Sequence, residues 1–188
     1  MTDPGQLVSR FVAGDQTAYR ELVERFQHRV FGVSMRMLGD RDDALDATQD
    51  VFLILYRKAD RYQERAAFST WLHRVTVNVC YDHLRRRSRT RSQPMADAFE
   101  PLDPTALDAF NSVELAGQIE AALAQLPAEF RAAVILADVE DLPIQQVADA
   151  LDLPLGTAKS RVFRGRRKLA ETLGNLSGQS SSQSRGDS

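Results

Sequence analysis

The sequence predicts an all-α protein of two small helical domains joined by a flexible acidic linker. Apolar residues recur at steps of three and four over most of the chain, and no window alternates with the period of two that a half-buried strand requires. A proline-containing stretch near the middle interrupts this periodicity. The chain has 188 residues, of which 43% are hydrophobic, so two small cores can form.

Three long helices are predicted in the first 90 residues. The first covers about 15–38 and stops at Gly39, the second about 41–59, and the third about 68–87 after a loop. Their apolar stripes are Tyr19, Leu22, Val23, Phe26, Val30, Val33 and Met37, then Ala44, Ala47, Val51, Phe52, Leu55 and Tyr56, then Trp71, Leu72, Val75, Val79 and Leu84. We expect these stripes to pack together into one domain over residues 1–90.

A linker is predicted over residues 91–111. Pro94, Pro101 and Pro104 interrupt this stretch, and proline removes a backbone donor and disfavours helix just before it. Helices resume at about Ser112, which gives a second domain over 112–173. The tail 174–188 is rich in Ser, Gly and Gln and is predicted to be disordered, because it cannot bury enough apolar surface to offset its ordering entropy.

The charges are segregated along the chain although the formal net charge is only -2. No Lys or Arg occurs from Ser92 to Phe130, where the charged residues are acidic. Basic clusters flank this segment on both sides: Arg85, Arg86, Arg87, Arg89 and Arg91 before it, and Lys159, Arg161, Arg164, Arg166, Arg167 and Lys168 after it. Local positive charge of this kind suits two contacts with a polyanion, although solvated helix faces would give the same pattern.

Several classes of protein are disfavoured. Cys80 is the one cysteine, so no intramolecular disulfide forms, and we see no apolar run suited to a secretory signal or a membrane span; we expect a cytoplasmic protein. His73, Cys80 and His83 share one side of a helix, but one helix cannot easily supply four tetrahedral ligands, so we expect packing or surface roles. No catalytic triad or phosphate-binding glycine loop is seen, and we expect neither an enzyme nor a cofactor.

A helix-turn-helix is predicted between about Pro143 and Leu169. Ile144, Val147, Ala148 and Leu151 form the inner stripe of a short helix, and residues 152–154 form the turn. The next helix, about 155–169, directs Ala158 and Val162 inward and its basic residues outward. Such a helix can enter the major groove of DNA, although a basic helical hairpin that contacts only phosphates or protein is the alternative.

Three segments resemble one protein family. The stretch 142–169, with its core Gly156-Thr157-x-Lys159-Ser160-Arg161, closely resembles region 4 of bacterial sigma factors of the extracytoplasmic-function (ECF) class. Residues 43–52 (DALDATQDVF) resemble region 2.2 of that class, and residues 68–78 (FSTWLHRVTVN) resemble its regions 2.3 and 2.4. The resemblance covers about residues 15–173. Asp152 stands where glycine is frequent in the family, and Gly165 inside the recognition helix costs about 1 kcal/mol relative to alanine.

The resemblance implies a subunit that binds core RNA polymerase, through the β′ clamp coiled coil and the β flap, and directs it to promoters. The minus-35 element would be read as duplex and the minus-10 element as a melted strand. The expected minus-35 contacts are Thr157, Lys159, Ser160, Phe163 and Arg164, with Arg161 and Arg167 on the backbone. Region 2.2 docks on the β′ coiled coil in the family, which assigns that role to Asp43, Asp46, Gln49, Asp50 and Phe52.

The acidic repeat in the second helix and the aromatic and amide residues near the third agree with these roles. Asp42, Asp46 and Asp50 repeat every four residues, and like charges at that spacing are unfavourable in a helix, so a basic partner is expected unless the face is simply solvated. Melting without ATP hydrolysis requires pockets that capture flipped bases. The expected minus-10 residues are Tyr62, Arg65, Phe68, Trp71, Arg74, Asn78, Arg85 and Arg86. Tyr62 and Asn78 are the preferred pocket residues, whereas Trp71 also fits a core position.

Two other functions remain open from the sequence. An ordinary helix-turn-helix repressor would explain the C-terminal half, and a protein with the sigma shape that binds polymerase or an inhibitor without initiating would explain both halves. Members of the family are usually held inactive by an anti-sigma factor, often membrane-bound, so we expect such a partner and no small-molecule substrate. The two domains are expected to be mobile in isolation.

Overall fold

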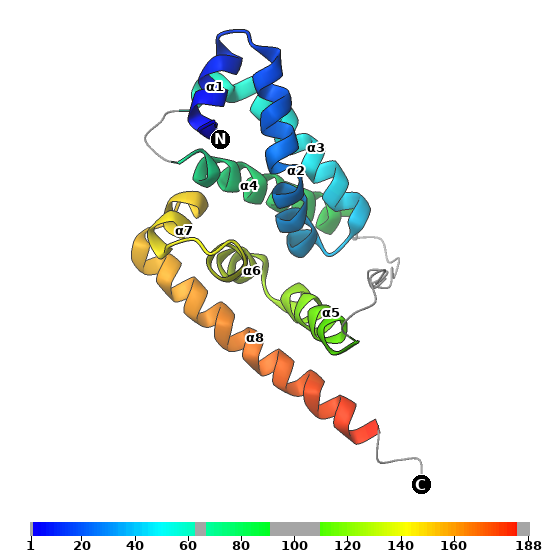
Figure 1. Cartoon of the computed structure of the whole chain (residues 1–188). Coiled ribbons are helices and arrows are strands. Elements are labelled where there is room, and N and C mark those ends of the chain that lie inside the picture. Colours follow the sequence, from blue (N-terminus) through cyan, green and yellow to red (C-terminus); the bar gives the residue numbers. More distant parts are fainter. Residues whose placement is uncertain (1, 63–66, 91–109, 184–188) are drawn as a thin grey trace.

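The computed structural model describes residues 2–62, 67–90 and 110–183, and these parts contain helices and no strand, which confirms the predicted fold class. The N-terminal helices are α1 (Pro4–Val12), α2 (Gln16–Leu38), α3 (Arg41–Lys58), the short 3-10 helix Ala59–Arg61 and α4 (Phe68–Thr90). The C-terminal helices are α5 (Phe110–Gln125), α6 (Ala128–Val134), a π-helical turn (Ile135–Val139), α7 (Ile144–Leu151) and α8 (Leu155–Gln183). Figure 1 shows α4 between the other N-terminal helices and the C-terminal group.

Local signals set the ends of the N-terminal helices. The carboxylates of Asp3, Asp15 and Asp40 accept hydrogen bonds from backbone N–H groups in the first turns of α1, α2 and α3, which would otherwise lack a partner. Gly39 ends α2 with a left-handed backbone (φ 70°), a conformation that glycine adopts without strain. Helix α1 was not predicted from the sequence, although Asp3 followed by Pro4 is a common start of a helix.

The C-terminal group is built around a close crossing of α6 and α8. Gly165 of α8 is buried there, and a Cβ atom at that position would lie 2.5 Å from Val134 Cγ2 and 3.1 Å from the Phe130 carbonyl oxygen of α6. The glycine therefore permits the approach of the two helices, which accounts for a residue that is unfavourable in an isolated helix.

The tail and the linker are the two segments for which the sequence predicts no regular structure. Helix α8 continues to Gln183, where the sequence predicts a disordered tail from residue 174. The difference has a physical reason, since adding a residue to an existing helix is much easier than starting one. The predicted linker, with its three prolines, lies outside the described residues except for its last two positions, because residues 91–109 are not described.

The two helical groups are docked on each other rather than separate. Their buried apolar side chains form one continuous cluster that extends from Leu7 to Val162. Helix α4 packs against α2 and α3 on one side and against α7 on the other. The arrangement brings the predicted minus-10 helix next to the helix-turn-helix.

Candidate DNA and polymerase interfaces

The helix-turn-helix forms as the sequence predicts. Asp152 ends α7 with a left-handed backbone (φ 56°), which Asp tolerates better than most residues, and Leu153 N–H donates to the Ala148 carbonyl oxygen at 2.9 Å. Ala148 and Ala158 are buried where α7 and α8 meet, because their small side chains permit close approach. This packing fixes the direction in which α8 presents its outer face.

The outer face of α8 carries the residues expected at the minus-35 element. Phe163 is 68% exposed, the largest exposed fraction among the large apolar side chains of the described residues. Thr157, Lys159, Arg164 and Arg167 are also exposed, whereas Ser160 and Arg161 are half-buried. A phenyl ring among cations can contact a thymine methyl group while the cations contact guanine edges and phosphates.

Arg166 differs from its basic neighbours on α8. Its guanidinium binds the Asp138 carboxylate with two nitrogens, Nε at 3.0 Å and Nη2 at 2.5 Å. The hydrogen bond with Asp138 raises the pKa of Arg166 further above its usual value. Arg166 thus ties α8 to the π-helical turn, and it is not one of the residues expected at the minus-35 element.

An aromatic cluster precedes and begins α4, where the minus-10 pocket is expected. The ring centroids of Tyr62 and Phe68 are 5.7 Å apart, those of Tyr62 and Trp71 6.0 Å, and those of Phe68 and Trp71 5.9 Å. Tyr62 and Trp71 are half-buried, so each presents part of its ring at the surface. Arg65 lies outside the described residues.

Phe68 is placed differently from the expectation of a direct base contact. Only 3% of this residue is exposed, and its ring packs edge-on against Phe26 of α2 with centroids 5.2 Å apart. In this arrangement the buried Phe68 ring packs against the partly exposed rings of Tyr62 and Trp71 and fixes their positions. A helical spacing does not tell which aromatic ring of the motif lies against a neighbouring helix.

The polar residues expected at the minus-10 element lie along α4. Arg74 and Asn78 are one helical turn apart and exposed, and Arg85 and Arg86 are exposed near the end of the helix. Arg74 Nη2 forms an ion pair with Asp152 Oδ2 at 2.8 Å, which connects α4 to the turn of the helix-turn-helix. Arg85 pairs with Asp82 at 3.3 Å on the same helix.

The acidic stripe of α3 divides into two sets. Asp43 pairs with Arg87 at 3.5 Å and Asp50 contacts His83 at 3.0 Å, so both tie α3 to α4. Asp42, Asp46 and Gln49 are exposed instead. These three residues form the part of the stripe that a basic partner can reach.

Three apolar side chains beside this acidic set are exposed, and none of them was predicted at the polymerase contact. Leu45, Leu53 and Tyr56 are 41%, 48% and 49% exposed, although Tyr56 was predicted in the core stripe. Phe52, expected at the polymerase contact, is only 7% exposed and packs in the core. The positions 45, 49, 53 and 56 share one helical face, and this spacing is the signal that locates the surface.

His73, Cys80 and His83 have three separate partners. His73 Nε2 lies 3.0 Å from Glu140, Cys80 Sγ lies 3.8 Å from Ser34 Oγ, and His83 contacts Asp50. Burial raises the pKa of the Cys80 thiol to about 12. Among the described residues, no group of three or more His, Cys, Asp or Glu side chains is arranged to hold a metal ion, and no helix is long and apolar enough to cross a membrane.

Comparison with known proteins agrees with this geometry. Residues 22–90 match the family Sigma-70 region 2, and residues 116–169 match Sigma-70 region 4. The chain is 39% identical over 174 residues to the ECF RNA polymerase sigma factor SigM of Mycobacterium tuberculosis, covering 91% of this chain and 85% of SigM. It is 37% identical over 166 residues to SigE of Mycolicibacterium smegmatis, covering 85% of this chain and 64% of SigE.

Solved structures share the same fold at lower identity. The sigma factor RpoE of Bartonella quintana, crystallised with the anti-sigma factor NepR, superimposes with a TM-score of 0.71 at 22% identity, over 82% of this chain and 96% of RpoE. CnrH in complex with the cytosolic domain of CnrY gives 0.69 at 21% identity, over 91% and 97% of the two chains. The chain belongs to the ECF class of RNA polymerase sigma factors.

Proposed function

We propose that this chain binds core RNA polymerase and directs promoter-specific initiation by reading minus-35 duplex and melted minus-10 DNA. The observation that carries the proposal is the outer face of α8, where Phe163 is 68% exposed among the exposed residues Lys159, Arg164 and Arg167. A face of this composition suits base recognition in the major groove. Because the chain belongs to the ECF class, we take RNA polymerase as the enzyme that this recognition directs to promoters.

For the minus-35 element, we assign base contacts to Lys159, Ser160, Phe163 and Arg164. Thr157, Arg161 and Arg167 would hold the backbone on either side. Arg167 pairs with Glu171 at 3.7 Å, and both side chains are well exposed, so the pair is weak and a phosphate can replace the carboxylate at little cost. Phosphate contacts fix the register, and the base contacts select the sequence.

For the minus-10 element, the proposed capture site combines Tyr62 and Trp71 with Asn78. A half-buried ring that packs against a buried ring can stack on an unpaired base, and an amide can bind a base edge. The cations Arg74, Arg85 and Arg86 along α4 would hold the phosphates of the same strand. Phe68 contributes indirectly, because it fixes the positions of both rings.

The proposed polymerase contact is the exposed face of α3. It places Asp46 and Gln49 beside Leu45, Leu53 and Tyr56. An apolar centre with acidic neighbours suits a basic coiled coil, since the apolar side chains supply burial and the carboxylates supply charge complementarity. Asp43 and Asp50 would act by holding α3 against α4. We also infer a contact between region 4 and the β flap.

An anti-sigma factor is proposed as the regulatory partner. The support is the likeness in fold to the sigma factor RpoE, which was crystallised in complex with the anti-sigma factor NepR. The role needs no catalytic residue of this chain, because the polymerase makes the phosphodiester bonds. Polymerase and promoter are both cytoplasmic, and we place the chain in that compartment.

Run-off transcription with purified core polymerase and a promoter library tests the function. Promoter-dependent transcripts that require this chain are the expected result. DNA binding without initiation would indicate a repressor instead, and polymerase binding without DNA binding would indicate an interaction protein. Either of these two results would overturn the proposal.

A further inference from the structure

The first helix, α1, lies next to the segment that leads into the proposed minus-10 capture site. It packs against α2 and against the 3-10 helix Ala59–Arg61, which directly precedes Tyr62. Leu7 and Val8 anchor it in the core, where they are 0% and 2% exposed. Helix α1 is therefore held at a fixed place beside Tyr62, although none of the residues assigned to DNA or polymerase lies on it.

Gly5, in the first turn of α1, approaches the Tyr62 side chain. The glycine is buried, and a Cβ atom at this position would lie 3.8 Å from Tyr62 Oη, which is an ordinary van der Waals distance. The same Cβ would lie 2.9 Å from Asp3 Oδ2, the end of a short side chain. The backbone of α1 thus closes the hydroxyl end of Tyr62, and a side chain that extends beyond Cβ toward Tyr62 would displace the hydroxyl group.

Hydrogen bonds hold the first turn of α1 in this position. The Asp3 carboxylate accepts from the N–H groups of Gly5 at 2.9 Å and Gln6 at 3.3 Å, which have no partner within the helix. Arg25 Nη1 of α2 donates to the Thr2 carbonyl oxygen at 2.8 Å. The segment before α1 is therefore tied to α2, and the first turn is stabilised by both contacts.

The Tyr62 ring has further aromatic neighbours. Its centroid lies 5.7 Å from that of Phe68 and 6.0 Å from that of Trp71, with interplanar angles of 85° and 66°. Phe68 is buried and packs on Phe26, and the Arg25 guanidinium lies 5.5 Å from the Phe26 centroid. Tyr62 is thus bounded by two rings of α4 and, at its hydroxyl end, by α1. These contacts leave its ring little freedom to rotate.

From these contacts we infer that the first turn of α1 positions Tyr62 for the capture of an unpaired minus-10 base, with Gly5 as the positioning residue. The inference rests on the proposed function of the Tyr62 site. Gly5 contacts no base itself and acts through Tyr62. Its effect is preorganisation, because a ring that is already fixed loses no conformational freedom when a base stacks on it.

Tryptophan fluorescence of the free chain tests the contact. Trp71 is the one tryptophan of the sequence and lies 6.0 Å from Tyr62, so its emission reports on the aromatic cluster. Gly5→Val should shift the emission maximum, because a β-branched side chain fills two of the three positions around Cβ and reaches the hydroxyl group. Gly5→Ala is the matched control, since its Cβ displaces Asp3 in the same way but only touches Tyr62. Circular dichroism should show equal helix content for both variants.

Binding of a promoter fork by the holoenzyme tests the function of the contact. The probe is a fork-junction DNA from a promoter that the wild-type holoenzyme transcribes, with 2-aminopurine in its single-stranded minus-10 segment. Gly5→Val should weaken fork binding about fivefold or more relative to Gly5→Ala, which corresponds to about 1 kcal/mol, the lower end of base–aromatic stacking. Tyr62→Phe removes the hydroxyl group that the valine meets, so the difference between the two Gly5 variants should shrink in that background.

The outcomes separate the inference from the proposed function. Wild-type holoenzyme that binds no promoter fork would contradict the proposed function. Wild-type binding with equal affinities for Gly5→Val and Gly5→Ala would overturn the inference instead. An undiminished difference between these variants in the Tyr62→Phe background would overturn it as well, because the effect would then not pass through the hydroxyl group.

Arg25→Gln is a second variant for the case that Gly5→Val does not fold. It removes the hydrogen bond to Thr2 without adding volume at position 5, so the first turn of α1 is held less firmly. We expect about twofold weaker fork binding than for Arg20→Gln, the control at an exposed position of the same helix. Equal binding by these two variants, with unchanged Trp71 emission, would likewise count against the inference.

Discussion

Replacement of Gly165 by alanine has two opposing effects on the free energy of unfolding. Alanine favours the helix by about 1 kcal/mol relative to glycine. The new Cβ, however, would lie 2.5 Å from Val134 Cγ2 and 3.1 Å from the Phe130 carbonyl oxygen, which is backbone and cannot rotate away. Overpacking of this kind costs about 1–3 kcal/mol in a well-packed core, and Val134 is only 2% exposed. We therefore expect Gly165→Ala to lower the free energy of unfolding by up to about 2 kcal/mol, and by about 1–3 kcal/mol relative to a Gly→Ala change on the same helix that meets no neighbour.

Urea denaturation followed by circular dichroism measures this change. Gly174→Ala on the same helix is the matched control, because an added Cβ there meets nothing within 4 Å. The control should stabilise the protein slightly or leave it unchanged. A Gly165→Ala variant as stable as the control would refute the close crossing of α6 and α8, because helix propensity alone would then explain both results.

The remaining predictions concern the binding surfaces. Arg164→Ala should weaken minus-35 binding at one or two base positions by about 1–3 kcal/mol, measured by competition with substituted duplexes, and a uniform loss would mean a phosphate contact only. Asp46→Lys should weaken binding to core polymerase in a titration, whereas Asp149→Lys on α7 should not; equal affinities would remove the α3 assignment. Asn78→Ala should leave polymerase binding intact but abolish permanganate-reactive thymines at the promoter, and normal reactivity would exclude the residue from the pocket. Cys80 should stay unalkylated at pH 8 in the folded protein, because a pKa of about 12 keeps the thiol protonated and burial blocks the reagent; rapid modification without denaturant would contradict its burial.

Helix limits and the helix-turn-helix could be predicted because their signals are local. Gly39, the cap Asp40 and the turn at Asp152 each act within a few residues, and the structure places all three as helix boundaries. The outward face of α8 follows from helical periodicity once Ala158 and Val162 are directed inward.

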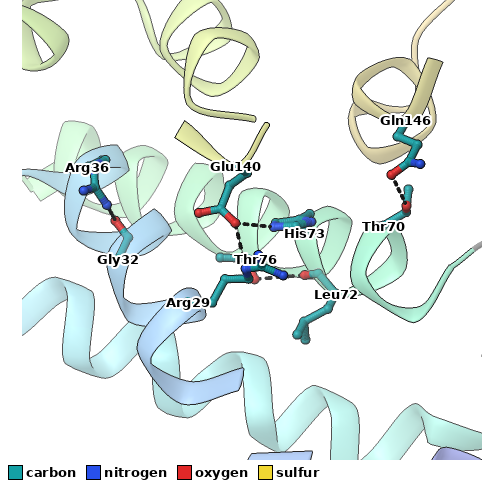
Figure 2. A network of polar contacts seen from close by, with 9 residues as sticks. All are labelled: Arg29, Gly32, Arg36, Thr70, Leu72, His73, Thr76, Glu140 and Gln146. Carbon is teal, nitrogen blue, oxygen red and sulfur yellow. Dashed lines mark hydrogen bonds and ion pairs between the residues drawn. The ribbon is translucent and has the colours of Figure 1, made fainter. Parts of the chain in front are cut away.

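The exposure of particular site residues could not be predicted in the same way. Phe52 and Phe68 lie in the motifs that identify their regions, yet both are core residues because neighbouring helices cover them. Glu140 contacts His73, 67 positions away in the sequence (Figure 2), and no local pattern indicates such a pairing. The docking of the two helical groups in the structure depends on such distant contacts, and the mobility of the domains in isolation stays a prediction.

Differences in exposure indicate which polar contacts between the two helical groups contribute most to their docking. The side chains of Arg74 and Asp152 are 46% and 77% exposed, so water and salt screen this pair and its loss costs little. Glu140 is 9% exposed and His73 4%, so removing one partner there leaves a charge that water cannot easily reach. A DNA phosphate can therefore displace Asp152 from Arg74 while the domains are still docked. The contacts of Glu140 with Arg29 and His73, in contrast, break only when the helices separate, and their loss costs more free energy than the loss of the exposed Arg74–Asp152 pair.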